Sequence, residues 1–175
     1  MSASHWFMLT VVGEDRPGIV AALTRVLYEG GCNLGETSML RLGGNFTVMM
    51  MINGATDAAA LEHIVRPISD KLKLRIHVDQ IAARLHDHHQ PNAQITVYGA
   101  DRAGIIADVT GTLAEAGFDI LDLNSDVAGS EQQPVYIMMI DGYVQGDVER
   151  LNHALQPLRD NGIEATLTPL DTLMA

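Results

Sequence analysis

The stretch Thr10-Val11-Val12-Gly13-Glu14-Asp15-Arg16-Pro17-Gly18 returns 86 residues later as Thr96-Val97-Tyr98-Gly99-Ala100-Asp101-Arg102-Ala103-Gly104. The same offset aligns apolar and small positions without a gap over residues 9–34 of the first copy. Chance does not keep two glycines, an aspartate and an arginine in register over such a span. The chain is therefore an internal duplication, and its repeat length suits one small domain.

Each copy carries the same order of hydrophobic patterns. In the first copy, β-rich runs bounded by turn residues predict strands at 6–12, 33–42, 46–52 and 74–81. Apolar residues at helical spacing follow Pro17 and end at Gly30-Gly31, and a second such pattern follows Asp57, a typical capping residue. The turn between the second and third strands is predicted at Gly43-Gly44-Asn45.

The second copy repeats this order. It predicts strands at 95–98, 119–127, 135–140 and 163–167, and helices at 103–116 and 147–159. Pro157 lies late in the last helical pattern. We expect that helix to end or kink there, because proline cannot donate the helical backbone hydrogen bond.

The order β-α-β-β-α-β, found twice, predicts the fold class. Right-handed crossovers turn it into a four-stranded antiparallel sheet with both helices on one face, so we expect an α+β protein of two tandem ferredoxin-like domains. We place the first domain at 1–84, a polar linker at 85–92 and the second domain at 93–175. One face of each sheet has no helices, so the two copies, or two chains in a homodimer, are expected to cover it or to extend the sheet sideways.

The composition bounds the classes of function. The chain has 175 residues, with 22 acidic and 11 basic side chains and a formal net charge of −11. Such a surface repels nucleic-acid phosphates, and no run of Lys or Arg offsets it, so direct DNA binding is not expected. Cys32 is the only cysteine, no secretory signal pattern is found at residues 1–6, and no apolar stretch approaches the roughly 20 residues that span a bilayer. The sequence therefore predicts a cytoplasmic protein without membrane contact.

The junction between the first strand and the first helix carries the chemistry. The amino terminus of a helix presents unpaired N–H groups and the positive end of its dipole, which hold a carboxylate or a phosphate. Gly18 and Gly104 lack side chains, so a ligand can approach the backbone there. Asp15 and Asp101 supply a carboxylate for an ammonium group. Amides for an anion beside a carboxylate for a cation match the two ends of an α-amino acid.

A purely structural interpretation stays open at this point. Asp15 and Asp101 can serve as helix caps alone, with Arg16 and Arg102 as solvated residues or as partners of those aspartates. The repetition of the loop does not decide between the two interpretations, since common descent alone explains it. On the structural interpretation the glycines only shape turns, and the protein is an interaction module.

Two segments carry a resemblance to a known family. Val12-Gly13-Glu14-Asp15-Arg16-Pro17-Gly18-Ile19-Val20, followed by Leu27 and by Gly31-Cys32-Asn33-Leu34, resembles the signature of the ACT domain. The resemblance covers nearly the whole chain as two copies, and the tandem arrangement is similar to the glycine cleavage system transcriptional repressor family. It implies a regulatory module that binds an amino acid, glycine or a similar one, at domain interfaces, through the first strand–helix loop and the start of the second strand. It also implies repression by contact with a separate DNA-binding transcription activator.

The resemblance implies which positions of each copy lie beside the ligand. They are Gly13, Asp15, Pro17, Gly18, Ile19 and Asn33 in the first copy, and Gly99, Asp101, Gly104, Ile105 and Asp119 in the second. The second copy departs from the pattern, because Ala103 replaces the proline and Asp119 stands where the first copy has Asn33. An amide donates to a carboxylate whereas an aspartate repels it, so the first copy is expected to hold the more intact site.

Other constellations do not support catalysis. His86-Asp87-His88-His89 is dense in potential metal ligands, but it lies in the predicted linker without a second cluster, so we expect solvated residues and no metal site. Cys32 has no nearby histidine and is expected to be a small buried residue. Without a phosphate-binding loop or a Ser/His/Asp arrangement, we predict no catalytic residues, no cofactor and no enzyme activity. The alternative is a regulatory subunit or interaction module of an amino-acid metabolic enzyme, since ACT modules are commonly attached to such enzymes.

Overall fold

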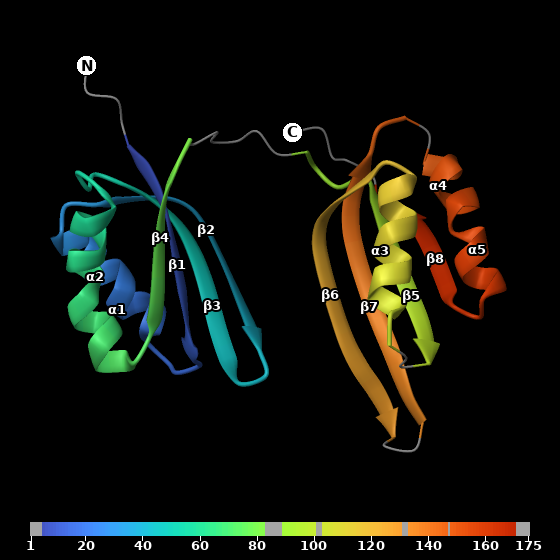
Figure 1. Cartoon of the computed structure of the whole chain (residues 1–175), viewed down its shortest axis with the longest axis horizontal. Coiled ribbons are helices and arrows are strands. Elements are labelled where there is room, and N and C mark those ends of the chain that lie inside the picture. The colour runs from blue at the N-terminus through green and yellow to red at the C-terminus, as the bar shows by residue number, and fades with distance from the viewer. Residues whose placement is uncertain (1–4, 83–88, 101–102, 131–132, 147, 171–175) are drawn as a thin grey trace. The chain divides into compact units, whose positions relative to one another are not determined.

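The computed structural model describes residues 5–82, 89–100, 103–130, 133–146 and 148–170. The chain folds as two compact units, which divide between Asp87 and His88 (Figure 1). Each unit has its own hydrophobic core. The linker predicted at 85–92 and the domain bounds beside it stay predictions, since half of that segment, residues 85–88, lies outside the described residues.

The first unit has the predicted order of elements. They are β1 (Trp6–Glu14), α1 (Ile19–Glu29), β2 (Asn33–Leu42), β3 (Asn45–Asn53), α2 (Ala58–Leu72) and β4 (Arg75–Ile81). The strands form one sheet in the order β2-β3-β1-β4, with every neighbouring pair antiparallel. Asp57 caps α2 as predicted, because its carboxylate accepts a hydrogen bond of 2.8 Å from the Ala60 N–H.

The second unit repeats the arrangement. Its elements are β5 (Ala93–Ala100), α3 (Ile105–Glu115), β6 (Phe118–Ser130), β7 (Gln133–Val144), α4 (Val148–Ala154), α5 (Gln156–Asp160) and β8 (Glu164–Pro169). The sheet order β6-β7-β5-β8 matches that of the first unit, and all neighbouring strands are again antiparallel. The predicted α+β class, with two tandem ferredoxin-like domains, is therefore confirmed.

Some elements of the second unit differ in extent from the prediction. The helical pattern at 147–159, expected to end or kink at Pro157, forms two helices that divide at Leu155, because Pro157 in the first turn of α5 has no N–H to continue the ladder of α4. Strands β6 and β7 also run further toward their connection than the apolar pattern indicated. Backbone pairing extends them through Ser130 and Gln133, where the sequence has no apolar alternation.

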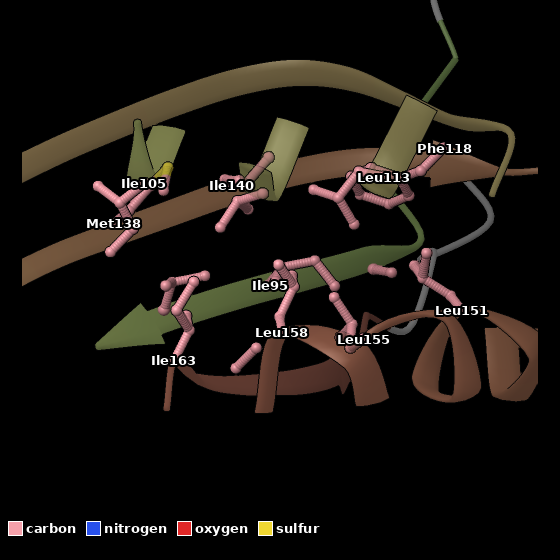
Figure 2. Packing of buried hydrophobic residues seen from close by; sticks show 14 of the residues in the cluster. Ile95, Ile105, Leu113, Phe118, Met138, Ile140, Leu151, Leu155, Leu158 and Ile163 are labelled. Atoms are coloured by element: carbon pink, nitrogen blue, oxygen red, sulfur yellow. The ribbon is translucent and has the colours of Figure 1, made fainter. Parts of the chain in front are cut away.

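Alternation along the strands explains why the helices lie on one face of each sheet (Figure 1). In the first unit Phe7, Leu9 and Val11 of β1 are buried against Leu23 and Leu27 of α1. In the second unit the same layer is seen in Figure 2, where the helices pack on the strands through Ile95, Ile105, Leu113, Met138, Ile140, Leu151, Leu155 and Leu158. Burial of these side chains is the main force that holds each unit together.

The opposite, helix-free face of each sheet keeps large apolar side chains exposed. In the first unit Leu40 is 55% exposed and Met49 is 45% exposed. In the second unit Tyr98 is 41% exposed and Met139 is 49% exposed. What covers these faces stays a prediction.

None of the helices in the described ranges has the length and apolar character that crossing a bilayer needs. In the predicted linker, His86, Asp87 and His88 lie outside the described residues. The ring of His89 stacks on Tyr143, with the ring centroids 4.4 Å apart. Within the part of the chain that the structure describes, no three His, Cys, Asp or Glu side chains gather as a metal site.

Candidate ligand-binding site

The first strand and first helix of each unit meet at a glycine in the left-handed region. Gly18 caps α1 with φ 88°, and Gly104 caps α3 with φ 91°. This conformation favours glycine over every residue with a Cβ. Nothing lies within 4 Å of the place where a Cβ would stand at either glycine. The backbone therefore requires these glycines, and the space beside them is open.

The first amides of α1 are left without a capping side chain in the described structure. The first helical backbone bond runs from the Ala22 N–H to the Gly18 carbonyl, at 2.9 Å. The N–H groups of Ile19, Val20 and Ala21 precede it and have no helical acceptor. Asp15 is therefore no helix cap, and the capping interpretation of this residue is wrong.

A cavity of about 370 Å³ lies beside these amides. Its volume falls within the range of small-molecule sites. It is formed by the loop before α1, the first turn of α1 and the β2–β3 hairpin, with the lining residues Asp15, Arg16, Pro17, Gly18, Ile19, Val20, Ala21, Met39, Arg41 and Phe46. The structure thus brings together four of the residues predicted for the site, Asp15, Pro17, Gly18 and Ile19, and adds the hairpin residues. That they bind a ligand stays a prediction.

The tip of the β2–β3 hairpin is fixed to the loop. Its two-residue turn has positive φ at both Gly43 (56°) and Gly44 (76°), the conformation of a tight hairpin turn. The Gly44 carbonyl accepts a hydrogen bond of 3.0 Å from the Asp15 N–H. Arg41 pairs with Phe46 across the hairpin, so both side chains lie on the face that carries α1. The hairpin therefore closes one side of the cavity.

Arg41 forms an ion pair with Asp15. The Asp15 side chain is 25% exposed and the Arg41 side chain 69%. Arg16, which the sequence offered as a partner for Asp15, instead pairs with Glu14 at 2.5 Å. Sequence reasoning missed Arg41, although its position two residues before the predicted turn at Gly43 was an available signal.

Two other predicted residues lie away from the cavity. A Cβ at Gly13 would stand 2.5 Å from Leu74 Cδ2, so this glycine serves the packing of β1 against the residue before β4. Asn33 pairs with Asn53, which pairs with Trp6 at the opposite end of β1 from Gly13. The first unit on its own therefore does not bring Asn33 to the Asp15 loop.

The second unit places its predicted residues in the same way. Gly99 lies at the end of β5, where an added Cβ would be 3.2 Å from Ile105 Cδ1 at the start of α3. Asp119 pairs with Tyr143 at the other end of the sheet and is exposed. Asp101 lies outside the described residues. The side chains of the hairpin differ between the units, since the registers align Arg41 with Val127 and Phe46 with Tyr136.

The first-unit cavity offers complementary charges within a small space. The α1 amides and the Arg41 guanidinium can both donate to a carboxylate. The Asp15 carboxylate can accept from an ammonium group. Met39 and Phe46 add an apolar wall. This set of groups suits a small zwitterion.

Each unit is a small βαββαβ domain of the α+β class, and the first helix of the first unit opens on a cavity at the end of the first strand. ACT domain models match residues 5–79 and residues 93–163 of the chain. The chain therefore belongs to the ACT-domain family and carries two ACT domains in tandem. The predicted resemblance to this family is confirmed.

Relatives of known sequence and structure agree with this assignment. The Escherichia coli glycine cleavage system transcriptional repressor is 28% identical over 134 residues, which cover 76% of this chain and 70% of the relative. The protein named UPF0237 protein YjhC of Lactococcus lactis is 36% identical over 76 residues, which cover 43% of this chain and 87% of the relative. A crystal structure of an unknown protein from Galdieria sulphuraria has a TM-score of 0.76 at 22% identity, covering 96% of this chain and 99% of the other, which shows the shared fold. The chain is thus a regulatory ACT-domain protein related to the glycine cleavage system repressor.

Proposed function

We propose that this protein is a non-catalytic sensor of a small amino acid, glycine or a similar one, and that it represses transcription by contacting a DNA-binding activator. The observation that supports the sensor role most strongly is the uncapped amino terminus of α1, which opens on a cavity flanked by the Asp15–Arg41 ion pair. The name of the Escherichia coli relative supports the repressor role. The net charge of −11 supports action through a protein rather than through DNA.

Ligand binding in this proposal is an exchange of ion pairs. The ligand carboxylate binds the Arg41 guanidinium and the α1 amides, and the ligand ammonium group pairs with the Asp15 carboxylate. An exposed pair such as Asp15–Arg41 contributes about 0–1 kcal/mol, so its loss costs little. A ligand that replaces one weak ion pair with two, and that also satisfies free amides, gains net binding free energy.

Strand β2 links the cavity to a partner surface in this proposal. Side chains alternate along a strand, so Arg41 faces the cavity while Leu40 and Leu42 leave the other face of the sheet. Leu40 is 55% exposed and Leu42 is 72% exposed. When Arg41 leaves its ion pair with Asp15 and binds the ligand, the end of β2 shifts, and these leucines move with it. Such a shift regulates a partner only if the partner binds one arrangement more tightly.

Calorimetry with a matched pair of variants tests the sensor role. The full chain is titrated with glycine, L-serine and the other proteinogenic amino acids, first unchanged and then as Asp15→Asn and Glu14→Gln. Both variants remove one carboxylate from neighbouring residues, but Glu14 pairs with Arg16 and does not line the cavity. We expect saturable binding that Asp15→Asn weakens about tenfold or more, since a charge-assisted contact is lost, and that Glu14→Gln leaves unchanged.

The outcome that overturns the sensor role is equally definite. If the folded protein binds none of these amino acids, or if Asp15→Asn binds one with the affinity of the unchanged chain, the Asp15 cavity is not the binding site. The chain would then be an interaction module in which the loop glycines only shape the backbone.

A further inference from the structure

Nearly all of the net negative charge of the chain belongs to its second unit. The first unit, residues 1–87, has 9 acidic and 8 basic side chains, whereas the second, residues 88–175, has 13 acidic and 3 basic ones. The two units have the same sheet order, so the fold itself does not require this difference. A charge excess of one sign acts instead on which molecules a surface attracts.

The helix-free face of the second sheet carries a row of residues with a carboxylate at each end. Across the four strands this row consists of Asp126, Ile137, Tyr98 and Glu164, because residues paired between antiparallel strands point to the same face. Ile137 lies between two buried residues of β7, so the row faces away from the helices. Both carboxylates are exposed.

A second row on the same face has two carboxylates side by side. Asp122 of β6 pairs directly with Asp141 of β7. Like charges at directly opposite positions of an antiparallel pair destabilise the sheet. Each carboxylate accepts a hydrogen bond from a neutral amide, Asp122 from Asn124 at 2.7 Å and Asp141 from Gln94 at 2.8 Å. These bonds leave both negative charges in place, so the repulsion persists in the free protein.

The described part of the chain does not neutralise these carboxylates. None of the four forms an ion pair with a described residue. Of the three arginines of the second unit, Arg150 lies on α4, and Arg159 lies on α5, where it donates to the Ala165 carbonyl. The third, Arg102, lies outside the described residues. Three arginines, two of them on helices that cover the other face, leave this face with an excess of negative charge.

Exposed apolar side chains lie among the carboxylates. Met139 lies between the two rows, Tyr98 lies within the first row, and Val135 lies beyond it on the same face. Apolar residues at the centre with polar residues around them are the usual anatomy of a protein–protein interface. We call this surface the acidic face and define it by Asp122, Asp126, Asp141 and Glu164 around Met139, Tyr98 and Val135.

The first unit lacks this arrangement at the matching positions. Its register places Leu40 where the second unit has Asp126. It places Arg75 where the second unit has Glu164. The carboxylates of the acidic face are therefore a property of the second copy alone.

The charge of the acidic face decides which kind of partner fits it. Two copies of this face repel each other, and so does the phosphate backbone of a nucleic acid. The helix-free face of the first unit offers Arg75 as the one Lys or Arg on its described strands, too little for four carboxylates. The fitting occupant is a different protein that carries Lys and Arg around an apolar centre.

We propose that the acidic face is a docking surface for a cationic protein, whose Lys and Arg side chains pair with the four carboxylates while its apolar residues cover Met139. The inference rests on the part of the proposed function in which the chain acts by binding another protein, and it is independent of amino-acid sensing. Charge complementarity of this kind speeds association and selects the partner. The acidic face is separate from the leucines of β2, which belong to the first unit.

A peptide titration of the full chain tests the proposal. The probe is a labelled amphipathic helical peptide of about 15 residues, with leucines along one side and lysines beside them. A second peptide, with glutamate in place of every lysine, is the charge control. Fluorescence anisotropy gives the Kd at low and at high salt. Thermal unfolding and sedimentation equilibrium record the stability and the oligomeric state of each protein.

Two double variants are matched in charge. Asp122→Asn with Asp141→Asn removes two carboxylates from the acidic face. Glu115→Gln with Asp160→Asn removes two from the ends of α3 and α5 in the same unit. Met139→Ser removes apolar surface from the acidic face without a change of charge.

We expect the lysine peptide to bind with a Kd that rises about fivefold or more in the acidic-face variant, the effect of two lost charge pairs. The Kd stays within about twofold in the helix-end variant, since those carboxylates lie on the other side of the sheet. Met139→Ser also weakens binding, salt weakens it, and the glutamate peptide does not bind. The acidic-face variant unfolds at or above the temperature of the unchanged chain, because the repulsion between Asp122 and Asp141 is removed.

Three results overturn the inference. Equal weakening by both double variants assigns binding to the net charge rather than to this face. A lysine peptide that does not bind, or a glutamate peptide that binds equally well, shows that the face takes no cationic partner. A dimer of the full chain that dissociates in Met139→Ser shows that a second copy covers the face. Amino-acid binding at the Asp15 cavity and partner capture through Leu42 are measured separately, so the proposed function stands or fails on its own.

Discussion

At the scale of single residues, Arg41 is the side chain on which the proposed site of the first domain depends most. It is the cation that faces both Asp15 and the cavity, and it is mostly exposed, so its contribution to folding is small. In the proposed function its role in ligand binding is larger, because a guanidinium holds a carboxylate through two parallel hydrogen bonds. Stability and affinity should therefore respond differently to its removal.

Arg41→Met should raise the Kd for the amino acid about tenfold or more, since it removes a charged donor to the carboxylate. The free energy of unfolding should change by less than about 1 kcal/mol. Calorimetry and urea unfolding measure the two effects. Arg75→Met is the control, because Arg75 lies on edge strand β4 and does not line the cavity. A large loss of stability with unchanged affinity would make Arg41 a structural residue.

Cys32 is a second residue whose chemistry follows from its surroundings, because burial makes its thiol unreactive. The side chain is 7% exposed, and burial raises the pKa of the thiol because the charged thiolate is poorly solvated. At a given pH the folded protein therefore holds less thiolate than the unfolded chain. This agrees with the prediction of a small buried residue.

Alkylation of Cys32 by iodoacetamide should be at least about tenfold slower in the native protein than in urea, since the thiolate is the reacting form. The native rate should also rise only at a higher pH than the rate of the unfolded chain, because the folded pKa is the higher of the two. Mass spectrometry at several pH values follows the reaction. Equal rates in the two states would show a reactive, accessible thiol.

At the scale of secondary-structure elements, the end of α2 carries a conformational strain. Lys73 has φ 56°, the single positive value at a residue other than glycine in the described chain. Its backbone N–H lies 3.3 Å from the Asp70 carbonyl, and the Leu74 N–H bonds to the Ser69 carbonyl at 2.8 Å. This left-handed ending is normally filled by glycine.

Lys73→Gly should therefore stabilise the first domain by about 0.5–1 kcal/mol, since glycine takes this conformation without strain. Lys71→Gly is the control, because it makes the same substitution inside the last turn of α2 and should destabilise by about 1 kcal/mol. Thermal unfolding of both variants measures the difference. If both glycines destabilise alike, the Lys73 conformation is not strained.

The elements also show how much of the fold could be predicted from the sequence. The duplication, the strand alternation and the caps were enough for the fold, because each depends on local or periodic chemistry. The ends of β6 and β7 escaped prediction, since pairing between the two strands extends them past their apolar residues. Arg41 escaped because its partner Asp15 is 26 residues away in the sequence, and only the hairpin register brings the two together.

At the scale of the whole molecule, the exposed leucines of β2 are the expected link to a protein partner. Leu42→Ser should weaken capture of the partner from a cell extract while leaving amino-acid affinity unchanged, since Leu42 does not line the cavity. Mass spectrometry of the captured proteins, with and without glycine, measures this. Recovery of a transcription activator supports the proposed function. Recovery of a metabolic enzyme instead supports a regulatory subunit. If the unchanged chain and Leu42→Ser capture the same amount of partner, the leucines of β2 do not bind it.

The central claim is that a small amino acid seats its carboxylate on the first amides of α1 and its ammonium group on Asp15. A crystal structure of the full chain, grown with the amino acid that calorimetry finds to bind most tightly, tests it directly. We expect the ligand in the cavity, with a carboxylate oxygen within about 3.2 Å of the Ile19 or Val20 nitrogen and with Arg41 turned from Asp15 to the ligand. A ligand bound elsewhere, with the Asp15–Arg41 pair intact and the cavity empty, would contradict the claim.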